Sequence, residues 1–182
     1  VLFSPILLVL AIIVKCTSPG PILFKQRRIG KDNKEFMIYK FRTMRIDTPN
    51  VATHLLKNPE QYITPIGKFM RKTSLDELPQ LFNILKGEMS VVGPRPALYN
   101  QYDLIEMRTN ANVHTVRPGL TGLAQVSGRD ELENEQKVYF DQQYVQKQSF
   151  FFDLKLIFLT VIKVFKSEGV VEGDTTSKKE IV

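Results

Sequence analysis

Residues 74–96 read SLDELPQLFNILKGEMSVVGPRP, and two adjacent carboxylates stand near the start of this stretch. Ser74 precedes Glu77 by three positions, the spacing of a capping box, in which two side chains accept backbone N–H groups at a helix start. Asp76 and Glu77 would then lie in a first helical turn, where acids complement the helix dipole. On spacing alone, stabilisation of a helix start is the simpler interpretation, and catalysis by the pair is the alternative.

The remainder of this stretch predicts a short helix, a buried strand and a rigid turn. Gly87 is a suitable residue to end the helix, and Ser90–Val92 has the composition of a buried strand. Prolines on both sides of Arg95 would fix its backbone and present the guanidinium. Four apolar side chains recur at helical spacing and predict a packing face: Leu78, Leu81, Phe82 and Leu85.

Composition is typical of a globular domain with a substantial core, since 43% of the 182 residues are hydrophobic and 24% are charged. A net charge of +6 indicates an anionic partner, which could be nucleic acid, anionic lipid or a phosphorylated substrate. A single cysteine, Cys16, excludes an internal disulfide and a thiolate metal cluster. His54 and His114 are too few for a histidine zinc site, so we expect any metal to be held by oxygen ligands, as magnesium is.

The chain opens with an apolar segment, VLFSPILLVLAIIV at residues 1–14. This run is shorter than the roughly 20 residues of a spanning helix, and it lacks an initiator Met, so we expect the segment to begin upstream. Pro5 removes a backbone donor, which makes Ser4-Pro5 a natural break in a helix. We therefore predict a re-entrant membrane helix over residues 1–18; a kinked spanning helix and a signal-peptide remnant are the alternatives.

A basic hairpin is predicted next, with strands at residues 21–28 and 35–43 joined by turn residues at 30–34. Its cations either bind phosphates or hold the protein to anionic lipid; Lys40 is the candidate for chemistry. Residues 46–62 are interpreted as a loop with at most a short helix at 51–57, and no chemistry is assigned to them.

Beyond the central stretch, residues 98–113 and 131–148 predict two helices, the first amphipathic and the second polar. Between them, VRPGLTGLAQVSGR at 116–129 has the glycines of a loop that approaches a ligand, and Arg117 repeats the rigid presentation of an arginine. It is not a P-loop, because the Lys–Ser/Thr ending is absent. Asp141 and Tyr144 lie one helical turn apart, and a structural hydrogen bond is the default interpretation.

The last helix, SFFFDLKLIFLTVIKVFKSEGV at 149–170, combines a large apolar face with a narrow polar side that carries Asp153, Thr160, Lys163 and Ser167. It is too charged to span a bilayer comfortably, and we expect it to lie in the membrane interface. A core helix is the alternative. Residues 169–182 are expected to form a poorly ordered, flexible tail.

Several motifs together resemble those of the bacterial sugar transferase family, the small monotopic phosphoglycosyl transferases. The resemblance covers nearly the whole chain and rests on the apolar start broken at Ser4-Pro5 and on four further motifs. These are YKFRTM at 39–44, RKTSLDELPQLFNILKGEMSVVGPRP at 71–96, VRPGLTGLAQVSGR at 116–129 and DQQY at 141–144. It implies an α+β fold, mainly helical with a short β-hairpin, in which residues 19–168 form the catalytic domain.

The resemblance also implies the reaction. A sugar 1-phosphate would pass from a UDP-sugar to polyprenol (undecaprenyl) phosphate, releasing UMP, with Asp76 as nucleophile and Glu77 as Mg²⁺ ligand. Asp141 would have a supporting role. Candidates for phosphate or nucleotide contact are Arg71, Lys40, Arg95 and Arg117.

Location and partners follow from the same resemblance. We expect the enzyme at the cytoplasmic face of a bacterial inner or plasma membrane, in contact with membrane lipids and without a nucleic-acid partner; homo-oligomerisation stays open. Residues 46–56 and 96–119 look most like capsule-synthesis enzymes that use a UDP-linked N-acetylated deoxysugar. Two other classes remain: a membrane-bound binding or scaffold protein, and a lipid-linked glycosyl transferase that releases UDP. The nucleotide released distinguishes all three.

Overall fold

The predicted α+β composition is confirmed in the computed structural model, which describes residues 4–49, 58–128 and 132–166. The elements are, in chain order, α1 (Ser4–Thr17), β1 (Leu23–Ile29), η1 (Lys31–Asn33), β2 (Glu35–Phe41), η3 (Pro59–Gln61), α2 (Pro65–Lys72), η4 (Leu75–Gln80), α3 (Leu81–Leu85), β3 (Ser90–Val92), α4 (Tyr102–Asn110), η5 (Val113–Thr115), β4 (Gly119–Thr121), α5 (Leu123–Ser127), α6 (Asn134–Lys147) and α7 (Phe150–Lys166). The predicted helix at 51–57 and the predicted tail lie outside the described residues.

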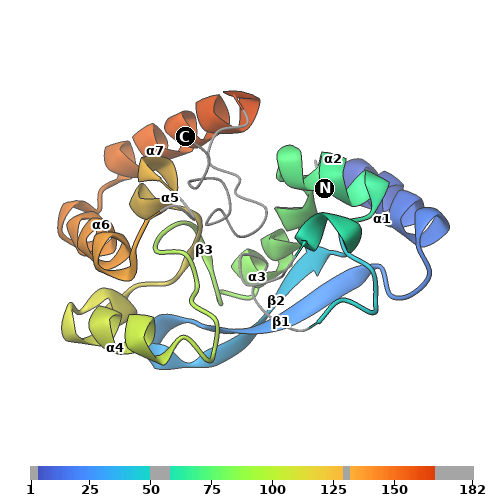
Figure 1. Cartoon of the computed structure of the whole chain (residues 1–182). Coiled ribbons are helices and arrows are strands. Elements are labelled where there is room, and N and C mark those ends of the chain that lie inside the picture. Colours follow the sequence, from blue (N-terminus) through green and yellow to red (C-terminus); the bar gives the residue numbers. More distant parts are fainter. Residues whose placement is uncertain (1–3, 50–57, 129–131, 167–182) are drawn as a thin grey trace, which may run out of the picture.

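The β-hairpin is confirmed, with strand ends within two residues of the prediction. β1 and β2 pair antiparallel from Leu23 opposite Phe41 to Ile29 opposite Glu35. Asp32 in the turn has φ 55°, a left-handed conformation that Asp and Asn tolerate better than most residues. The hairpin runs along the lower side of the molecule in Figure 1, beneath α1 and α2 and beside α4.

A second, parallel pair of short strands lies between the hairpin and the C-terminal helices. β3, predicted at Ser90–Val92, pairs with β4, which the sequence did not reveal. Gly119 makes this pairing possible, because a Cβ there would collide with the backbone nitrogen of Gly93. The pairing therefore sets the start of the Gly-Pro-Arg-Pro turn against residues 118–121.

Three buried apolar clusters hold these elements together. One joins α1, β2 and α2, a second joins β3, α6 and α7, and a third joins Ala97 to α4 and α6. The predicted helix at 98–113 is shorter than expected, since α4 occupies only its centre. The predicted packing face of α3 is partly wrong, because Phe82 is 50% and Leu85 83% exposed.

The described part of the N-terminal helix, Ser4–Thr17, is continuous and includes Pro5. Leu10 and Val14 pack against the domain, and much of the remaining apolar surface faces outward. In the part of the chain that the structure describes, every helix is too short or too polar to cross a bilayer. Residues 1–3 lie outside the described residues, so the re-entrant geometry stays a prediction.

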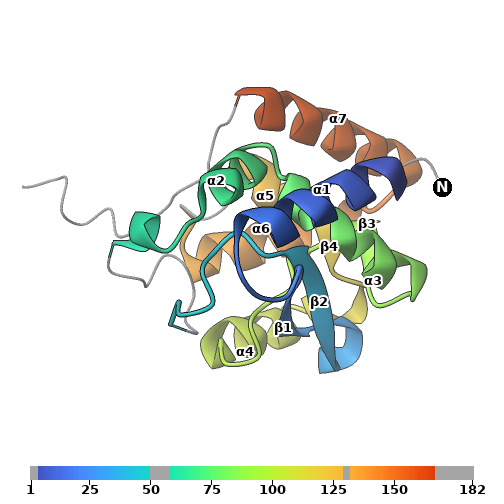
Figure 2. The same cartoon turned by 90° about the vertical axis from the view of Figure 1, so that its right-hand side faces the viewer.

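Helix α7 contacts the domain through both polar and apolar side chains and exposes other apolar side chains to solvent. Thr160 bonds Thr121 Oγ1 at 2.6 Å, and Asp153 Oδ1 accepts from Tyr144 at 3.0 Å. Leu156, between them, is buried, whereas Phe151 is 81% and Phe158 66% exposed. Two members of the polar side predicted from the sequence, Asp153 and Thr160, therefore help to attach the helix, and Ser167 lies outside the described residues. In Figures 1 and 2, α7 and α1 both lie toward the upper side of the molecule, and α4 lies toward the lower side.

Candidate active site

The two acids lie on a 3-10 helix, η4, and the predicted capping box is wrong. Ser74 has φ 56° and its side chain makes no capping bond. Its N–H bonds the carbonyl of Arg71 at the end of α2, and its own carbonyl accepts from Glu77 N. A helix, η4, therefore does begin directly after Ser74, but without the predicted side-chain caps. The Glu77 carboxylate is consequently available to side chains from other elements.

Glu77 is the centre of an ion-pair cluster. Its Oε1 lies 2.7 Å from Lys40 Nζ and 3.4 Å from Arg95 Nη2. The side chains of Glu77, Lys40 and Arg95 are 12%, 16% and 36% exposed, so the Arg95 side of the cluster is the more open one. Strand β2, helix η4 and the Gly-Pro-Arg-Pro turn each contribute one member.

Asp76, the other acid, has a different electrostatic environment. Burial raises the pKa of its carboxyl to about 6, and the negative charge of Glu77 acts in the same direction. Lys40, Arg71 and a backbone hydrogen bond oppose this rise in pKa without cancelling it. Two neighbouring carboxylates thus differ in role: Glu77 is neutralised by cations, while Asp76 is partly desolvated and only moderately acidic.

The Lys40 ammonium lies among charges of both signs. Burial lowers its pKa, Glu77 and Asp76 raise it, and Arg95 and Arg28 lower it further. Lys40 follows Ile38 on the same face of β2, which places its side chain toward η4 rather than toward solvent. This position explains how a residue 37 positions before Glu77 in sequence becomes its partner.

The structure brings together five of the seven predicted site residues and separates the other two. Arg71, in the last turn of α2, is close enough to lower the pKa of Asp76. Arg117 is exposed, and its Nη2 lies 3.9 Å from where a Cβ on Gly87 would stand. Asp141 is fully buried in α6 and pairs with Arg108 instead of a member of the Glu77 cluster.

Asp141 is paired with Arg108, a residue that the sequence analysis missed. Its Oδ2 accepts from Arg108 Nε at 3.0 Å and from Nη2 at 2.6 Å. The expected hydrogen bond to Tyr144 is wrong, because the Tyr144 hydroxyl lies 3.2 Å from the Val92 carbonyl oxygen and bonds Asp153. The available signal was an arginine four residues after Leu104 on the buried side of α4, which implies a buried acidic partner.

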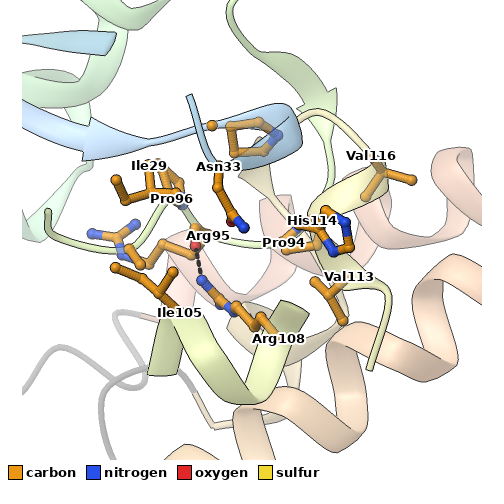
Figure 3. A pocket seen from close by; sticks show the side chains of 13 residues that line it. Ile29, Asn33, Pro94, Arg95, Pro96, Ile105, Arg108, Val113, His114 and Val116 are labelled. Atoms are coloured by element: carbon orange, nitrogen blue, oxygen red, sulfur yellow. Dashed lines mark hydrogen bonds between the residues drawn. The ribbon is translucent and has the colours of Figure 1, made fainter. Parts of the chain in front are cut away.

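A hollow lies beside the Gly-Pro-Arg-Pro turn, between the hairpin, α4 and η5 (Figure 3). Figure 3 shows Arg108 reaching the backbone oxygen of Arg95, with Asn33 and His114 across the hollow. His54 lies outside the described residues. The hollow adjoins the backbone of the turn, whereas the Arg95 guanidinium contacts Glu77.

The described residues contain no group of three His, Cys, Asp or Glu side chains that could hold a metal ion. The donor set nevertheless suits Mg²⁺, which proteins often bind through one or two carboxylates together with water and substrate phosphate oxygens. Asp76 and Glu77 are two adjacent carboxylates of that kind. Lys40 and Arg95 already contact Glu77 Oε1, so a metal ion would share this carboxylate with two side-chain cations.

A family model described as bacterial sugar transferase matches residues 1–167. The UDP-glucose:undecaprenyl-phosphate glucose-1-phosphate transferase of Escherichia coli strain K12 is 45% identical over 178 residues, covering 92% of this chain and 38% of that protein. The UDP-N-acetylgalactosamine-undecaprenyl-phosphate N-acetylgalactosaminephosphotransferase of Aeromonas hydrophila is 38% identical over 174 residues, covering 92% and 41%. An uncharacterized sugar transferase of Bacillus subtilis strain 168, EpsL, is 45% identical over 167 residues, covering 92% and 81%. The chain thus spans about two fifths of the first two relatives.

Proposed function

The chain belongs to the bacterial sugar transferase family, and from this premise we propose that it transfers a sugar 1-phosphate from a UDP-sugar to undecaprenyl phosphate. The names of the E. coli and Aeromonas relatives describe this type of reaction. The single observation that best supports it here is the contrast between the two acids. Asp76 is partly desolvated with a pKa of about 6, beside a Glu77 that is held by Lys40 and Arg95.

In the first step, an Asp76 carboxylate oxygen attacks the phosphorus that carries the sugar. A new P–O bond forms to Asp76, the bond between that phosphorus and the bridging oxygen breaks, and UMP leaves with the electron pair. A carboxylate with a pKa near 6 is ionised at neutral pH, yet it is more basic than an ordinary aspartate. Lys40, Arg71 and Arg95 offset the repulsion between the attacking anion and the diphosphate.

In the second step, a phosphate oxygen of the polyprenol phosphate attacks the phosphorus of the aspartyl phospho-sugar. The P–O bond to Asp76 breaks, the carboxylate is regenerated, and a polyprenyl diphosphate sugar is released. Splitting one displacement into two lets each substrate meet the same carboxylate in turn.

We propose that Glu77 holds Mg²⁺ together with the diphosphate of the substrate. The ion would supply Lewis-acid stabilisation of the phosphate charge. Lys40 and Arg95 orient the Glu77 carboxylate for that role through their contacts with Oε1.

We also propose that the protein works at the cytoplasmic face of a bacterial membrane, where a lipid-linked and a water-soluble substrate can meet. The support is apolar surface exposed along α1 and α7, both toward one side of the molecule in Figures 1 and 2. Such surfaces are typical of helices that lie in the membrane interface. The exposed apolar side chains of these two helices are Ile6, Leu8, Val9, Ile12, Phe150, Phe151, Leu154, Phe158 and Val161.

For the sugar we propose an N-acetylated deoxysugar, and for the product an entry into capsule or other surface glycan assembly. This choice rests on the likeness of residues 46–56 and 96–119 to capsule-synthesis enzymes. The printed names of relatives include glucose and N-acetylgalactosamine, so both belong in any substrate screen.

The test is the nucleotide released when UDP-sugars are screened with undecaprenyl phosphate and Mg²⁺. Release of UMP supports the proposal, UDP would indicate an ordinary glycosyl transferase, and neither nucleotide would indicate a binding protein. Asp76→Asn should abolish both UMP release and covalent labelling by a UDP-sugar. Glu77→Gln should remove most activity and flatten the Mg²⁺ titration, and an unchanged titration would place the metal elsewhere.

A further inference from the structure

The backbone of the turn that carries Arg95 is held at four successive carbonyl oxygens. Prolines at 94 and 96 leave this segment with few N–H groups, so its carbonyls are the main groups by which the protein can fix it. The donors come from three separate places in the chain: the end of β1, α4 and the start of β4. Pro94 O accepts from Gly119 N at 2.9 Å, Arg95 O from Arg108 Nη1 at 2.8 Å, Pro96 O from Arg28 Nη1 at 2.9 Å, and Ala97 O from Ile29 N at 2.9 Å.

Arg108 differs from the other donors because it belongs to a buried ion pair. Its side chain is 10% exposed and that of Asp141 is 1% exposed. Nε and Nη2 of Arg108 are used by Asp141 Oδ2, and Nη1 is left to reach the Arg95 carbonyl (Figure 3). Asp141 therefore fixes the guanidinium plane that in turn fixes Arg95.

This buried ion pair carries a desolvation cost that apolar side chains in the same space would not have. Removing two charges from water is unfavourable, and apolar side chains of similar volume often stabilise a fold as well or better. Asp141 Oδ1 makes no hydrogen bond within the described residues, and burial raises the pKa of this carboxyl. Stability alone is a poor reason for such a pair.

We propose that Arg108 and Asp141 are positioning residues for Arg95. The pair fixes the Arg95 carbonyl, and the prolines on either side restrict the backbone of the turn. The Arg95 guanidinium is thereby kept in contact with Glu77, at 3.4 Å. Asp141 has no exposed surface, so it acts on the site through Arg108 rather than by touching a substrate. The geometric part of this proposal stands on the structure, and its kinetic part rests on the proposed function.

The geometric part is tested by NMR of ¹⁵N-arginine-labelled protein in detergent, with the Arg95 Nε signal assigned by its loss in Arg95→Lys. In Arg108→Gln, the Arg95 signal should move toward the position of a free arginine. A paired replacement, Arg108→Met with Asp141→Leu, removes both buried charges and should recover unfolding free energy while the Arg95 signal stays displaced. An Arg95 signal unchanged in either variant would overturn the proposal.

The kinetic part is tested by a double-mutant cycle on UMP release. Arg108→Gln should lower kcat by about 10- to 100-fold, the usual cost of a misplaced site group. In an Arg95→Gln background the same change should cost less than about threefold, because residues that act through one another are not additive. If the two substitutions lower kcat by independent factors, so that the double variant shows the product of both, the positioning role would be overturned.

Arg42 provides the matched control. It is 5% exposed and donates to the backbone carbonyls of Pro21 at 2.7 Å and Ser18 at 2.9 Å, like Arg108 a buried arginine bonded to main chain. Arg42→Gln should leave the Arg95 signal in place, and any effect on kcat should multiply with that of Arg95→Gln. If wild-type protein releases no UMP, the proposed function fails, and the NMR result still decides the geometry.

Discussion

At the scale of single residues, the site depends on the different environments of two adjacent carboxylates, Asp76 and Glu77. Both are acidic residues with ordinary pKa values near 4 in water. Glu77 has two cations in contact, whereas burial raises the pKa of Asp76 to about 6. Separation of the pKa values of neighbouring acids is a common way to assign different chemical roles to them.

The raised pKa of Asp76 predicts a pH-dependent cost to stability. Because its folded pKa lies above the unfolded value of 3.8, its favourable contribution is present below about pH 4 and is lost as pH rises through 6. Asp76→Asn should therefore raise the unfolding free energy by about 2–3 kcal/mol at pH 7.5 in metal-free buffer, and by much less at pH 4. Chemical denaturation in detergent at the two pH values measures this difference.

Lys40→Met is the control for the origin of that pKa. The Lys40 charge lowers the pKa of Asp76, so its removal should move the ¹³C titration midpoint of the Asp76 carboxyl to higher pH. A midpoint that moves down, or an Asp76→Asn variant that is less stable than wild type at pH 7.5, would contradict this electrostatic assignment.

At the scale of elements, the sequence patterns predicted the helices and strands that depend on interactions between near neighbours in the chain. The hairpin follows from its turn residues, and Ser90–Val92 follows from its apolar run. A helix does begin directly after Ser74, as its spacing to Glu77 suggested, but the capping box failed because Ser74 is left-handed and its side chain makes no capping bond. Strand β4 was missed because three residues become a strand only through pairing with a distant segment.

The Asn83 side chain of α3 makes hydrogen bonds to β2 of the kind that a neighbouring strand would make. Asn83 Oδ1 accepts from Tyr39 N at 3.1 Å, and Asn83 Nδ2 donates to Met37 O at 2.7 Å, both on β2. Asn83→Leu would leave two partly buried backbone groups without their Asn83 partner, and we expect a loss of about 1–3 kcal/mol in unfolding free energy. Because Lys40 follows Tyr39, UMP release should fall as well.

Lys86→Ala is the matched control on the same segment. Lys86 is exposed and donates to the Tyr39 hydroxyl at 3.0 Å, so its removal should change the unfolding free energy by less than about 0.5 kcal/mol. Denaturation midpoints that coincide for Asn83→Leu and wild type would show that this link does not matter.

At the scale of the whole molecule, the sequence identified most site residues but could not pair them. Lys40 meets Glu77 across 37 positions and Arg108 meets Asp141 across 33, and both contacts exist only once the elements have packed. Resemblance to a family indicated Asp76 and Glu77, since the local pattern had a simpler interpretation. Arg108 had neither a motif nor a local partner, and only the fold reveals its role.

The arrangement of exposed apolar surface leads to the last prediction, on membrane binding. Phe151 and Phe158 of α7 are 81% and 66% exposed, and Tyr102 of α4 is 72% exposed. In Figures 1 and 2, helix α7 lies toward the upper side of the molecule and helix α4 toward the lower side. A buried aromatic side chain gains about 1.5–3 kcal/mol on leaving water, so Phe151→Ser with Phe158→Ser should weaken partition into phosphatidylglycerol–phosphatidylethanolamine vesicles by more than about tenfold. Unfolding free energy should change little, because both side chains are already in solvent. Tyr102→Ser, an aromatic of similar exposure on the opposite side, should leave sedimentation with vesicles unchanged; equal losses for the two sides would mean that α7 has no special part in membrane binding.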